Sequence, residues 1–211
     1  MSGRLITLEG GEGAGKSTVL EAVRQQLTRH RLDVVVTREP GGTAFGEAVR
    51  VLVLDPQQRE VCAESELLLM FAARAQLVRE VILPALLDGR WVVSDRYTDA
   101  SFAYQGGGRG QPEARIAELA AWAAPVAPDL TLLLDLPVAD GLARAGARGA
   151  ADRIERESEA FFQRVRRAYR ERAVAEPARF RVIDAGQPVD IVRAAAVAAV
   201  DGYLGSSGAL A

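Results

Sequence analysis

The sequence predicts an α/β fold in which a parallel sheet of five strands carries helices on both faces. Short β-rich runs alternate with longer helical patterns along the 211 residues, and this alternation is typical of βαβ units. Four of the five runs are almost continuously apolar, as expected of parallel strands that are covered on both sides. A chain of this length can bury a substantial core, so we expect residues 1–211 to form a single domain.

The strands are expected where β-branched and large apolar residues cluster. In chain order, they are predicted at residues 5–8, 34–37, 91–94, 130–135 and 181–183. The last run is short, which favours a place at the edge of the sheet.

Helices are predicted between these strands, at residues 18–29, 44–54, 63–87, 112–124, 154–175 and 189–204. The first helix directly follows the first strand, as a βα unit requires. The third is the longest, and Pro84 is expected to bend or tighten its end because proline lacks the amide hydrogen of a helix interior.

Three stretches lack apolar periodicity and are predicted to be loops. They are residues 38–43 (REPGGT), 105–111 (QGGGRGQ) and 144–153 (RAGARGAADR). In an α/β sheet, the loops at the carboxyl ends of the strands form the ligand crevice, and the first two stretches follow strands or helices at the strand ends. The tail, residues 205–211, is expected to be flexible.

Composition limits the classes of partner. The chain has 26 basic and 28 acidic side chains and a formal charge of −2, which argues against binding nucleic acid or a membrane over a wide surface. Cys62 is the single cysteine, so no internal disulfide is possible and a reducing cytoplasm is the natural setting. No signal peptide and no run of roughly 18 apolar residues is visible. We therefore expect a soluble cytoplasmic protein.

Residues 10–17 read GGEGAGKS and match the pattern G-x-x-x-x-G-K-[ST] between a predicted strand and a predicted helix. This is a P-loop, whose successive amide groups face a polyphosphate at the positive end of a helix dipole. Lys16 is then able to reach the β- and γ-phosphates, and the Ser17 hydroxyl is able to ligate Mg²⁺. The predicted nucleotide-binding residues are Gly10, Gly11, Glu12, Gly13, Ala14, Gly15, Lys16, Ser17 and Thr18. A chance glycine-rich turn is disfavoured because the surrounding pattern agrees with a P-loop NTPase fold.

Further features separate the classes of P-loop protein. No N-K-x-D segment of guanine-specific GTPases is present, and the second loop position is Gly11 in place of the lysine of partition ATPases. The chain also leaves no space for the second domain of a helicase-like motor. A small-molecule kinase is therefore the class that the sequence favours.

A second cluster follows the third predicted strand, within residues 92–110 (VVSDRYTDASFAYQGGGRG). Asp95, at the strand end opposite the P-loop, is expected to hold Mg²⁺ together with Ser17. Arg96 offers a planar fork that matches a phosphate, and Arg38 with Glu39 enters the same crevice from the REPGGT loop. A surface ion pair is the alternative interpretation of Asp95 and Arg96.

Several sequence blocks follow one another in a family-specific order. They are GGEGAGKS at 10–17, REPGGT at 38–43, FAAR at 71–74, DRY at 95–97 with AYQG at 103–106, and RG at 148–149 with DRIE at 152–155. In this order the blocks resemble those of bacterial thymidylate kinases over nearly the whole chain. The resemblance implies an ATP- and Mg²⁺-dependent phosphorylation of dTMP to dTDP for dTTP biosynthesis, and it implies a homodimer.

The resemblance also implies roles for individual side chains. Glu12 is expected to point to the 3′-hydroxyl of the acceptor sugar, Arg74 to donate to thymine O4, and Tyr104 to lie against the sugar 2′ position. The expected acceptor-binding residues are Glu12, Arg38, Met70, Phe71, Arg74, Arg96, Ser101, Tyr104 and Gln105.

The P-loop has no basic residue among its four variable positions, so another segment must supply a cation to the transferring phosphoryl group. An arginine-rich lid is expected at residues 144–156, closing on bound ATP. The expected catalytic residues are Lys16, Arg96, Arg148 and Arg153. Arg144 and Arg156 are expected to belong to the flanking helices, and a solvated basic face is the alternative for the whole segment. No catalytic base is needed, because the acceptor is already an anionic phosphate oxygen.

The chain departs from the family pattern at two positions. The family places a phenylalanine four residues before the arginine of the long helix, where it stacks on thymine, but this chain has Met70 there and an aromatic at Phe71. Helical phase puts Met70 on the face of Arg74, so we predict that Met70 lies on the base and Phe71 packs into the core. Ala100 stands where the family has serine, and Ser101 follows it.

Two alternative functions stay open from the sequence alone. One is a kinase for another nucleoside monophosphate or nucleoside on the same scaffold. The other is a non-catalytic binding protein that uses the P-loop as a nucleotide-dependent switch.

Overall fold

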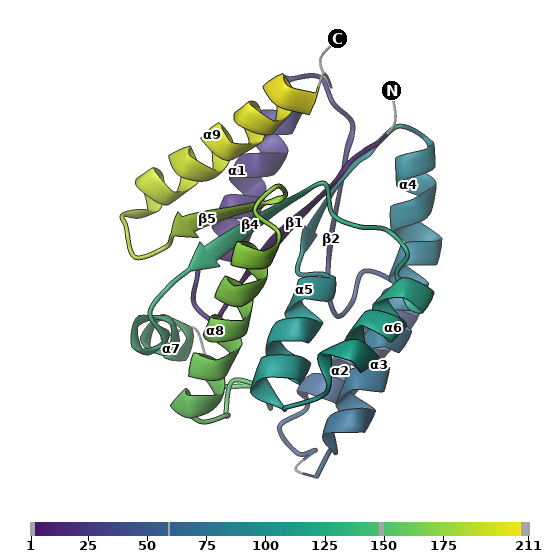
Figure 1. Ribbon diagram of the computed structural model, residues 1–211, viewed down its shortest axis with the longest axis vertical. Coiled ribbons are helices and arrows are strands. Elements are labelled where there is room, and N and C mark those ends of the chain that lie inside the picture. Colours follow the sequence, from purple (N-terminus) through teal and green to yellow (C-terminus); the bar gives the residue numbers. More distant parts are fainter. Residues whose placement is uncertain (1–2, 59, 148–149, 208–211) are drawn as a thin grey trace.

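The computed structural model describes residues 3–58, 60–147 and 150–207. At its centre lies a five-stranded sheet with the order β2-β3-β1-β4-β5, in which every neighbouring pair is parallel. The strands are β1 (Leu5–Gly10), β2 (Val34–Arg38), β3 (Trp91–Asp95), β4 (Leu130–Asp135) and β5 (Phe180–Asp184). The predicted parallel sheet is confirmed, and the fifth strand lies at its edge (Figure 1).

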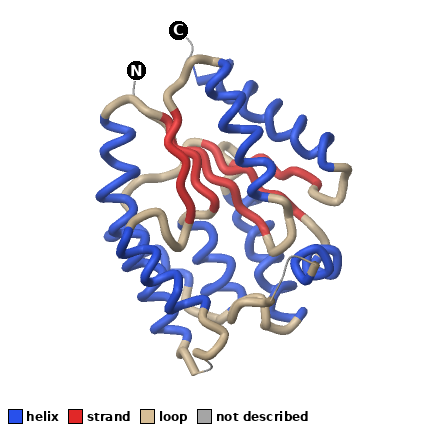
Figure 2. The backbone as a smooth tube through the Cα atoms, turned by 180° about the vertical axis from the view of Figure 1, so that it is seen from behind, coloured by secondary structure: helices blue, strands red, loops and turns tan. Residues whose placement is uncertain are grey.

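Helices cover both faces of this sheet (Figures 1 and 2). The α-helices are α1 (Lys16–Arg29), α2 (Ala44–Leu54), α3 (Ala63–Leu77), α4 (Leu83–Leu87), α5 (Thr98–Ser101), α6 (Glu113–Ala123), α7 (Val138–Gly146), α8 (Glu159–Ala175) and α9 (Val189–Ser207). Two π-helical segments are η1 (Val78–Ile82) and η2 (Phe102–Gly108). None of the helices within the described residues is long and apolar enough to span a bilayer.

Successive side chains of β1 point to opposite faces of the sheet, and this alternation decides which residues enter the core on each face. Ile6 and Leu8 enter the core that α1 and α9 form with one face. Leu5 points to the opposite face and packs with the end of α3, η1 and α4. Glu9 therefore also points to this second face, where it is fully buried at the carboxyl end of the strand.

The predicted long helix is three successive segments, α3, η1 and α4. Pro84 lies in the first turn of α4, directly after the π-helical turns. The proline ring displaces the carbonyl four residues earlier, and the wider π turn accommodates that displacement. Pro84 thus marks a change of helix type at this point, and the turns before it are widened where a bend or a tightening was expected.

The prediction of a loop at residues 105–111 was wrong for its first part, because η2 continues through Gly108. Glycine is a poor helix former on its own, but here the missing side chains allow α8 to approach. A Cβ atom at Gly107 would lie 2.7 Å from the Cβ of Ala168, and one at Gly108 would lie 2.4 Å from the ring of Phe161. Tertiary packing therefore overrides the local preference.

The lid region also differs from its prediction. Helix α8 begins at Glu159, not at residue 154, with Ser158 as its N-cap, and the unpredicted α7 ends at Gly146. Asp152 explains the turn between them, because its carboxylate accepts hydrogen bonds from the amides of Ile154 and Glu155 at 2.8 and 2.9 Å. Such side-chain capping competes with helical hydrogen bonds.

Helix α9 extends into residues 205–211, the tail that was expected to be flexible. Residues 205–207 are the last part of α9. The other four, 208–211, lie outside the described residues.

Candidate active site

The P-loop runs from the end of β1 into α1 and wraps around the Lys16 ammonium group. Lys16 Nζ donates to the carbonyl oxygens of Gly10 and Gly11 at 3.2 and 3.0 Å. Burial, and then the charge of Arg96, lower the pKa of this lysine. Gly13 has a φ of 68° and passes so close to α7 that a Cβ atom would lie 2.1 Å from the carbonyl oxygen of Gly141. Glycine is therefore required at this position by both backbone conformation and space.

A cavity of about 590 Å³ opens above the P-loop at the carboxyl ends of the strands. It is lined by residues 12–18 and by Arg38, Glu39, Arg50, Asp95, Arg96, Arg144, Ala145, Ala150, Asp152 and Glu155. Among the described residues of this lining, five are basic: Lys16, Arg38, Arg50, Arg96 and Arg144. Five acidic residues line the same cavity, Glu12, Glu39, Asp95, Asp152 and Glu155. Cations and helix N-terminal amide groups that suit a polyphosphate therefore lie beside carboxylates that suit a metal ion.

Two carboxylate oxygens in this cavity are buried without a hydrogen-bond partner among the described residues. They are Asp95 Oδ1 and Glu39 Oε1, and both side chains line the 590 Å³ cavity, called the phosphate cavity from here on, together with Ser17. Burial raises the pKa of Glu39 in spite of the adjacent Arg74. Carboxylate and hydroxyl oxygens are the ligands that Mg²⁺ prefers, so the expected pair of Ser17 and Asp95 fits a divalent cation.

A second cavity, of about 110 Å³, adjoins the first and shares Glu12, Glu39, Arg50, Arg96 and Asp152 with it. The remaining lining residues are Pro40, Leu54, Met70, Arg74, Ala100, Ser101, Tyr104, Gln105 and Ile154. This second cavity is called the base cavity below. Among its described lining residues five are apolar and nine are polar or charged, a mixture that suits a planar ligand with polar substituents. The expected acceptor residues are thus brought together, with the exceptions of Phe71 and Arg38.

Phe71 is buried in a core cluster with Leu67 and Ile116 and is absent from the described lining of the base cavity. Met70, one residue earlier, lines that cavity. This packing agrees with the predicted division between the two side chains. The ring of Phe71 supports Arg74 from the core side, and the guanidinium carbon of Arg74 lies 4.5 Å from the ring centroid.

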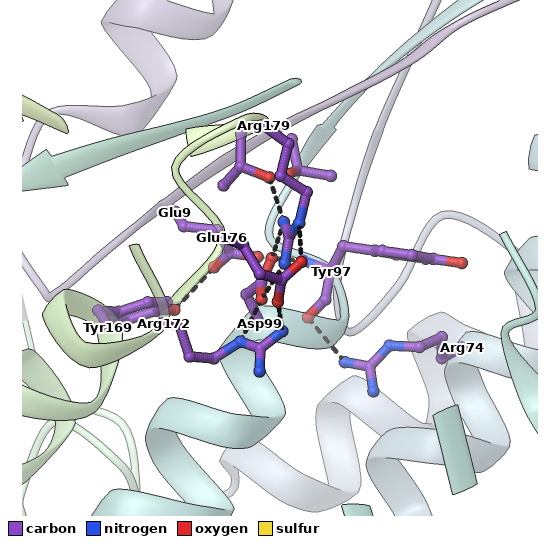
Figure 3. A network of polar contacts seen from close by, with 10 residues as sticks. Glu9, Arg74, Tyr97, Asp99, Tyr169, Arg172, Glu176 and Arg179 are labelled. Carbon is purple, nitrogen blue, oxygen red and sulfur yellow. Dashed lines mark hydrogen bonds and ion pairs between the residues drawn. The ribbon is translucent and has the colours of Figure 1, made fainter. Parts of the chain in front are cut away.

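Arg74 is held by three further contacts that leave it only 2% exposed. Its Nε donates to Glu39 at 2.7 Å and its Nη1 to the Ser101 hydroxyl at 2.9 Å. Its Nη2 donates to the Tyr97 carbonyl at 3.1 Å (Figure 3). Because each contact uses a different nitrogen, the orientation of the guanidinium plane is set before a ligand arrives. Ser101 therefore reaches the base cavity both directly and through Arg74.

Arg96 connects the two cavities and has a left-handed backbone, with a φ of 72°. Its Nη2 donates to Glu12 at 2.8 Å and to the Tyr104 hydroxyl at 2.9 Å, and its Nη1 donates to the Gly10 carbonyl at 3.0 Å. Tyr104 in turn donates to Glu12 at 2.8 Å. A non-glycine residue in this backbone region is strained, so these side-chain contacts help to hold Arg96 in place.

Arg38 is more exposed and pairs with Glu47 of α2 at 2.9 Å. Arg50, also on α2, is half-buried, donates to the Pro40 carbonyl at 3.0 Å and lines both cavities. The sequence interpretation missed Arg50 because it belongs to no motif. Its place in the helix that follows REPGGT was the one available signal.

The buried side of the site was also missed. Glu9 accepts from the Tyr97 amide and from the Tyr169 hydroxyl, both at 2.7 Å (Figure 3). Tyr169 accepts from Arg96 Nη1 at 3.1 Å, so it joins α8 to the active-site arginine. Burial, and then the negative charge of Asp99, raise the pKa of Glu9 to about 8.

Asp99 itself is neutralised by two arginines. It is fully buried on α5 and accepts from Arg172 at 2.5 Å and from Arg179 at 2.7 and 2.9 Å (Figure 3). A buried carboxylate needs such partners, since an unpaired charge in the interior is costly. The pair of arginines explains how an acid next to Glu9 is tolerated.

The lid arginines are arranged differently from expectation. Arg148 lies outside the described residues. Arg153 does not belong to the described lining of either cavity, and its guanidinium contacts Glu66 and the Val53 carbonyl. Arg144, at the end of α7, lines the phosphate cavity, whereas Arg156 contacts the carbonyls of Ala151 and Pro56.

A third hollow, of about 420 Å³, lies on the other side of the P-loop. Its lining residues are Ala14, Gly15, Thr18, Val19, Arg144, Ala185, Gly186, Gln187, Pro188, Val189 and Val192. Arg144 forms part of its wall by donating to the Ala185 carbonyl at 3.0 Å. The sequence interpretation missed this loop, although it follows β5 at the same edge of the sheet as the other ligand-facing loops.

Comparisons with known proteins agree with this geometry. The family model described as thymidylate kinase matches residues 8–196. A thymidylate kinase from Methylococcus capsulatus is 57% identical over 203 residues, covering 96% of this chain and 97% of that protein. One from Ectopseudomonas mendocina is 54% identical over 195 residues, covering 92% and 93%.

A solved structure shows the same fold. The crystal structure of thymidylate kinase from Ehrlichia chaffeensis superposes with a TM-score of 0.78 at 28% identity, covering 95% of this chain and 99% of that one. Matches of this extent span the P-loop, both cavities and the lid region. The chain belongs to the thymidylate kinase family.

Proposed function

We propose that the phosphate cavity and the base cavity hold the two nucleotides of the family reaction, with their phosphates meeting at Arg96. The enzyme is a dTMP kinase that uses ATP to phosphorylate dTMP in dTTP synthesis. The observation that supports the assignment of sites is that the two cavities share Arg96 and Arg50. A donor in one and an acceptor in the other would bring their phosphates to the same cations.

On the donor side, the P-loop amides and Lys16 would hold the ATP phosphates. The hollow beside residues 185–189 is the proposed place of the donor base, since it adjoins the P-loop at Gly15 and Thr18. Ser17 and Asp95 would hold Mg²⁺, which neutralises the phosphate oxygens when bound. Arg144 and Arg148 are the proposed lid cations for the transferring group.

On the acceptor side, Arg96, Arg38 and Arg50 would hold the phosphate of dTMP. Glu12 is proposed to accept from the 3′-hydroxyl, and Tyr104 to contact the sugar 2′ position. Because the attacking oxygen is already anionic, these residues need only position it and screen its charge.

For the base, Arg74 is proposed to donate to thymine O4, with Met70 against the ring face. Cytosine carries an amino group in place of O4 and would leave the arginine donor unpaired. An unsatisfied buried polar group costs about 1–3 kcal/mol, which corresponds to roughly ten- to hundredfold discrimination against dCMP.

The decisive experiment is a coupled assay of ADP release with ATP, Mg²⁺ and each nucleoside monophosphate in turn. We expect the highest kcat/KM with dTMP and a value at least roughly tenfold lower with dCMP. A higher value with another monophosphate would contradict the base assignment. ATP binding without acceptor-dependent ADP release would instead indicate the nucleotide-switched binding protein.

We also propose a homodimer that forms through α2, α3 and α6. Exposed large apolar side chains gather on these helices, with Val51 73% and Trp122 81% exposed, and α3 packs between the other two (Figure 1). The remaining members of this apolar patch are Phe45, Leu52 and Leu68. Exposed apolar side chains on helices that pack side by side are typical of protein interfaces.

Sedimentation of variants tests the dimer. Val51→Asp with Leu68→Asp is expected to give a monomer, because the change places charge in a desolvated contact. Val174→Asp is the matched control, since Val174 is 81% exposed on α8 outside the patch. A dimer that survives the double change would contradict the interface.

We further propose a cytoplasmic location, as expected of a protein whose single cysteine forms no internal disulfide.

A further inference from the structure

Glu66 is a fully buried carboxylate on α3, outside both cavities. It lies one helical turn before Met70 and two turns before Arg74, so the three residues share one face of α3. Its Oε1 accepts from Gln105 Nε2 at 2.9 Å and from Arg109 Nε at 3.2 Å. Its Oε2 accepts from Arg153 Nη2 at 2.6 Å.

The contact with Gln105 decides how this amide meets a ligand. An ionised carboxylate can only accept hydrogen bonds, so the amide nitrogen of Gln105 must face Glu66. Gln105 lines the base cavity, and its side-chain carbonyl oxygen is the group that stays available to a ligand there. Thymine presents an N3–H donor to such an acceptor, whereas N3 of cytosine is itself an acceptor.

The contact with Arg153 decides where residues 150–157, the lid strap, lie. Arg153 is anchored by Glu66 and also donates to the Val53 carbonyl at 2.7 Å, while its amide donates to the Leu54 carbonyl at 3.0 Å. Arg109 adds a second link through Glu157 of the strap at 2.5 Å. Two other strap residues, Asp152 and Ile154, line the base cavity.

The charge on Glu66 is maintained by these same partners. Burial by itself favours the neutral form, but hydrogen bonds from Gln105, Arg109 and Arg153 hold the pKa of this carboxyl below its usual value. Glu66 is therefore ionised at neutral pH.

We propose that Glu66 is a positioning residue whose single carboxylate sets the acceptor orientation of Gln105 in the base cavity and docks the lid strap through Arg153. Base recognition and lid placement then share one anchor. This inference rests on the proposed base site and deepens it.

The test is Glu66→Gln in the full chain, assayed with ATP, Mg²⁺ and either dTMP or dCMP. The neutral amide is able to accept from Gln105 or donate to it, so the Gln105 amide is free to turn. We expect the kcat/KM ratio of dTMP to dCMP to fall roughly tenfold and kcat with dTMP to fall severalfold. Glu64→Gln is the matched control, because it removes the same charge from an exposed position in the same helix turn, and it should leave both values unchanged.

Arg153→Gln tests the docking of the lid strap separately from the orientation of Gln105. It leaves Glu66 in place, so it can be assayed even where Glu66→Gln does not fold. It should lower kcat severalfold while keeping the ratio of dTMP to dCMP, because Gln105 still faces Glu66. Adding it to Glu66→Gln should lower kcat less than the product of the single effects, since both changes remove one contact.

A merely structural role for Glu66 would lower activity with both acceptors equally, so an unchanged ratio in a folded Glu66→Gln enzyme would overturn the proposal. So would Arg153→Gln with the wild-type kcat. Failure of the proposed base site itself is recognised separately, because the wild-type enzyme would then show no preference for dTMP over dCMP.

Discussion

Tyr169 donates its hydroxyl to Glu9 at 2.7 Å and, through the same oxygen, accepts from Arg96 at 3.1 Å. A residue of α8 thereby joins a buried acid behind the P-loop to the arginine that connects the two cavities. The partners are 160 and 73 residues away in the sequence. Arg96 is therefore positioned by the packed core as well as by its own strand end.

Replacing Tyr169 by phenylalanine keeps the ring and removes this bridge. We expect the KM for dTMP to rise roughly three- to tenfold, with a loss of about 1–2 kcal/mol in the free energy of unfolding, as for a buried hydrogen bond. Steady-state kinetics and urea unfolding measure the two effects. Tyr203→Phe is the control, because Tyr203 loses only a 3.4 Å contact with Asp129 remote from the cavities. An unchanged KM in Tyr169→Phe would show that Arg96 needs no such support.

Stability should depend on pH through Glu9. Its pKa is raised from 4.5 to about 8 by burial and by Asp99, against the effects of Arg96, Tyr169 and the Tyr97 amide. A raised folded-state pKa means that the stabilisation is present below the unfolded value and is lost as the pH rises through the folded one.

The measurement is the free energy of unfolding at pH 5.5 and pH 8.5 for the wild type and for Glu9→Gln, which does not titrate. The wild type is expected to lose more than about 1 kcal/mol relative to the variant over this range, since one pKa unit corresponds to 1.36 kcal/mol. Parallel pH profiles for the two proteins would contradict the raised pKa.

Lys16 is the only lysine among the 26 basic residues of the chain, so Lys16→Ala leaves the protein without a lysine. We expect kcat to fall roughly 10²-fold or more, as for loss of one preorganised charge. Binding of dTMP, measured by calorimetry, should stay nearly intact because the lysine acts on the donor phosphates. Near-normal turnover would contradict the P-loop assignment.

Met70 and Phe71 should respond oppositely to truncation. Met70→Ala is expected to lower kcat/KM for dTMP severalfold with little loss of stability, because Met70 faces the base cavity. Phe71→Ala is expected to cost about 3–5 kcal/mol of stability, as for a buried aromatic side chain. Kinetics and thermal unfolding of both variants test this division. A larger catalytic loss in a stably folded Phe71→Ala would show that the two roles are interchanged.

The lid cations are tested by Arg148→Ala and Arg144→Ala, each compared with Arg156→Ala. If they act on the transferring phosphoryl group, kcat should fall with little change in either KM, because loss of a contact made only in the transition state lowers kcat and kcat/KM equally. Single-turnover transfer measures this step directly. Wild-type rates for both variants would remove the lid from catalysis.

Local sequence determined the fold class and the P-loop. The P-loop needs only neighbouring residues, a strand, glycines and a helix start, so the position of Lys16 and Ser17 follows from 10–17 alone. The alternation of apolar runs with helical patterns likewise determined the parallel sheet, because a strand that is buried on both faces has apolar residues along its own length. Helical phase placed Met70 and Phe71 on different sides of α3 for the same reason.

Tertiary structure decided what depends on distant partners. Arg153 contacts Glu66 across 87 residues of sequence, and no local pattern distinguishes an arginine that meets phosphate from one that meets a buried acid. The local sequence predicted a loop at the glycines of η2, yet they form a helix because α8 packs directly against them. Hydrophobic period and turn chemistry act within a few residues, whereas the partners of a buried charge are selected by the packing of whole elements. For this reason the motifs of the site were legible in the sequence, and the supports of Arg96, Gln105 and the lid strap were visible only in the folded chain.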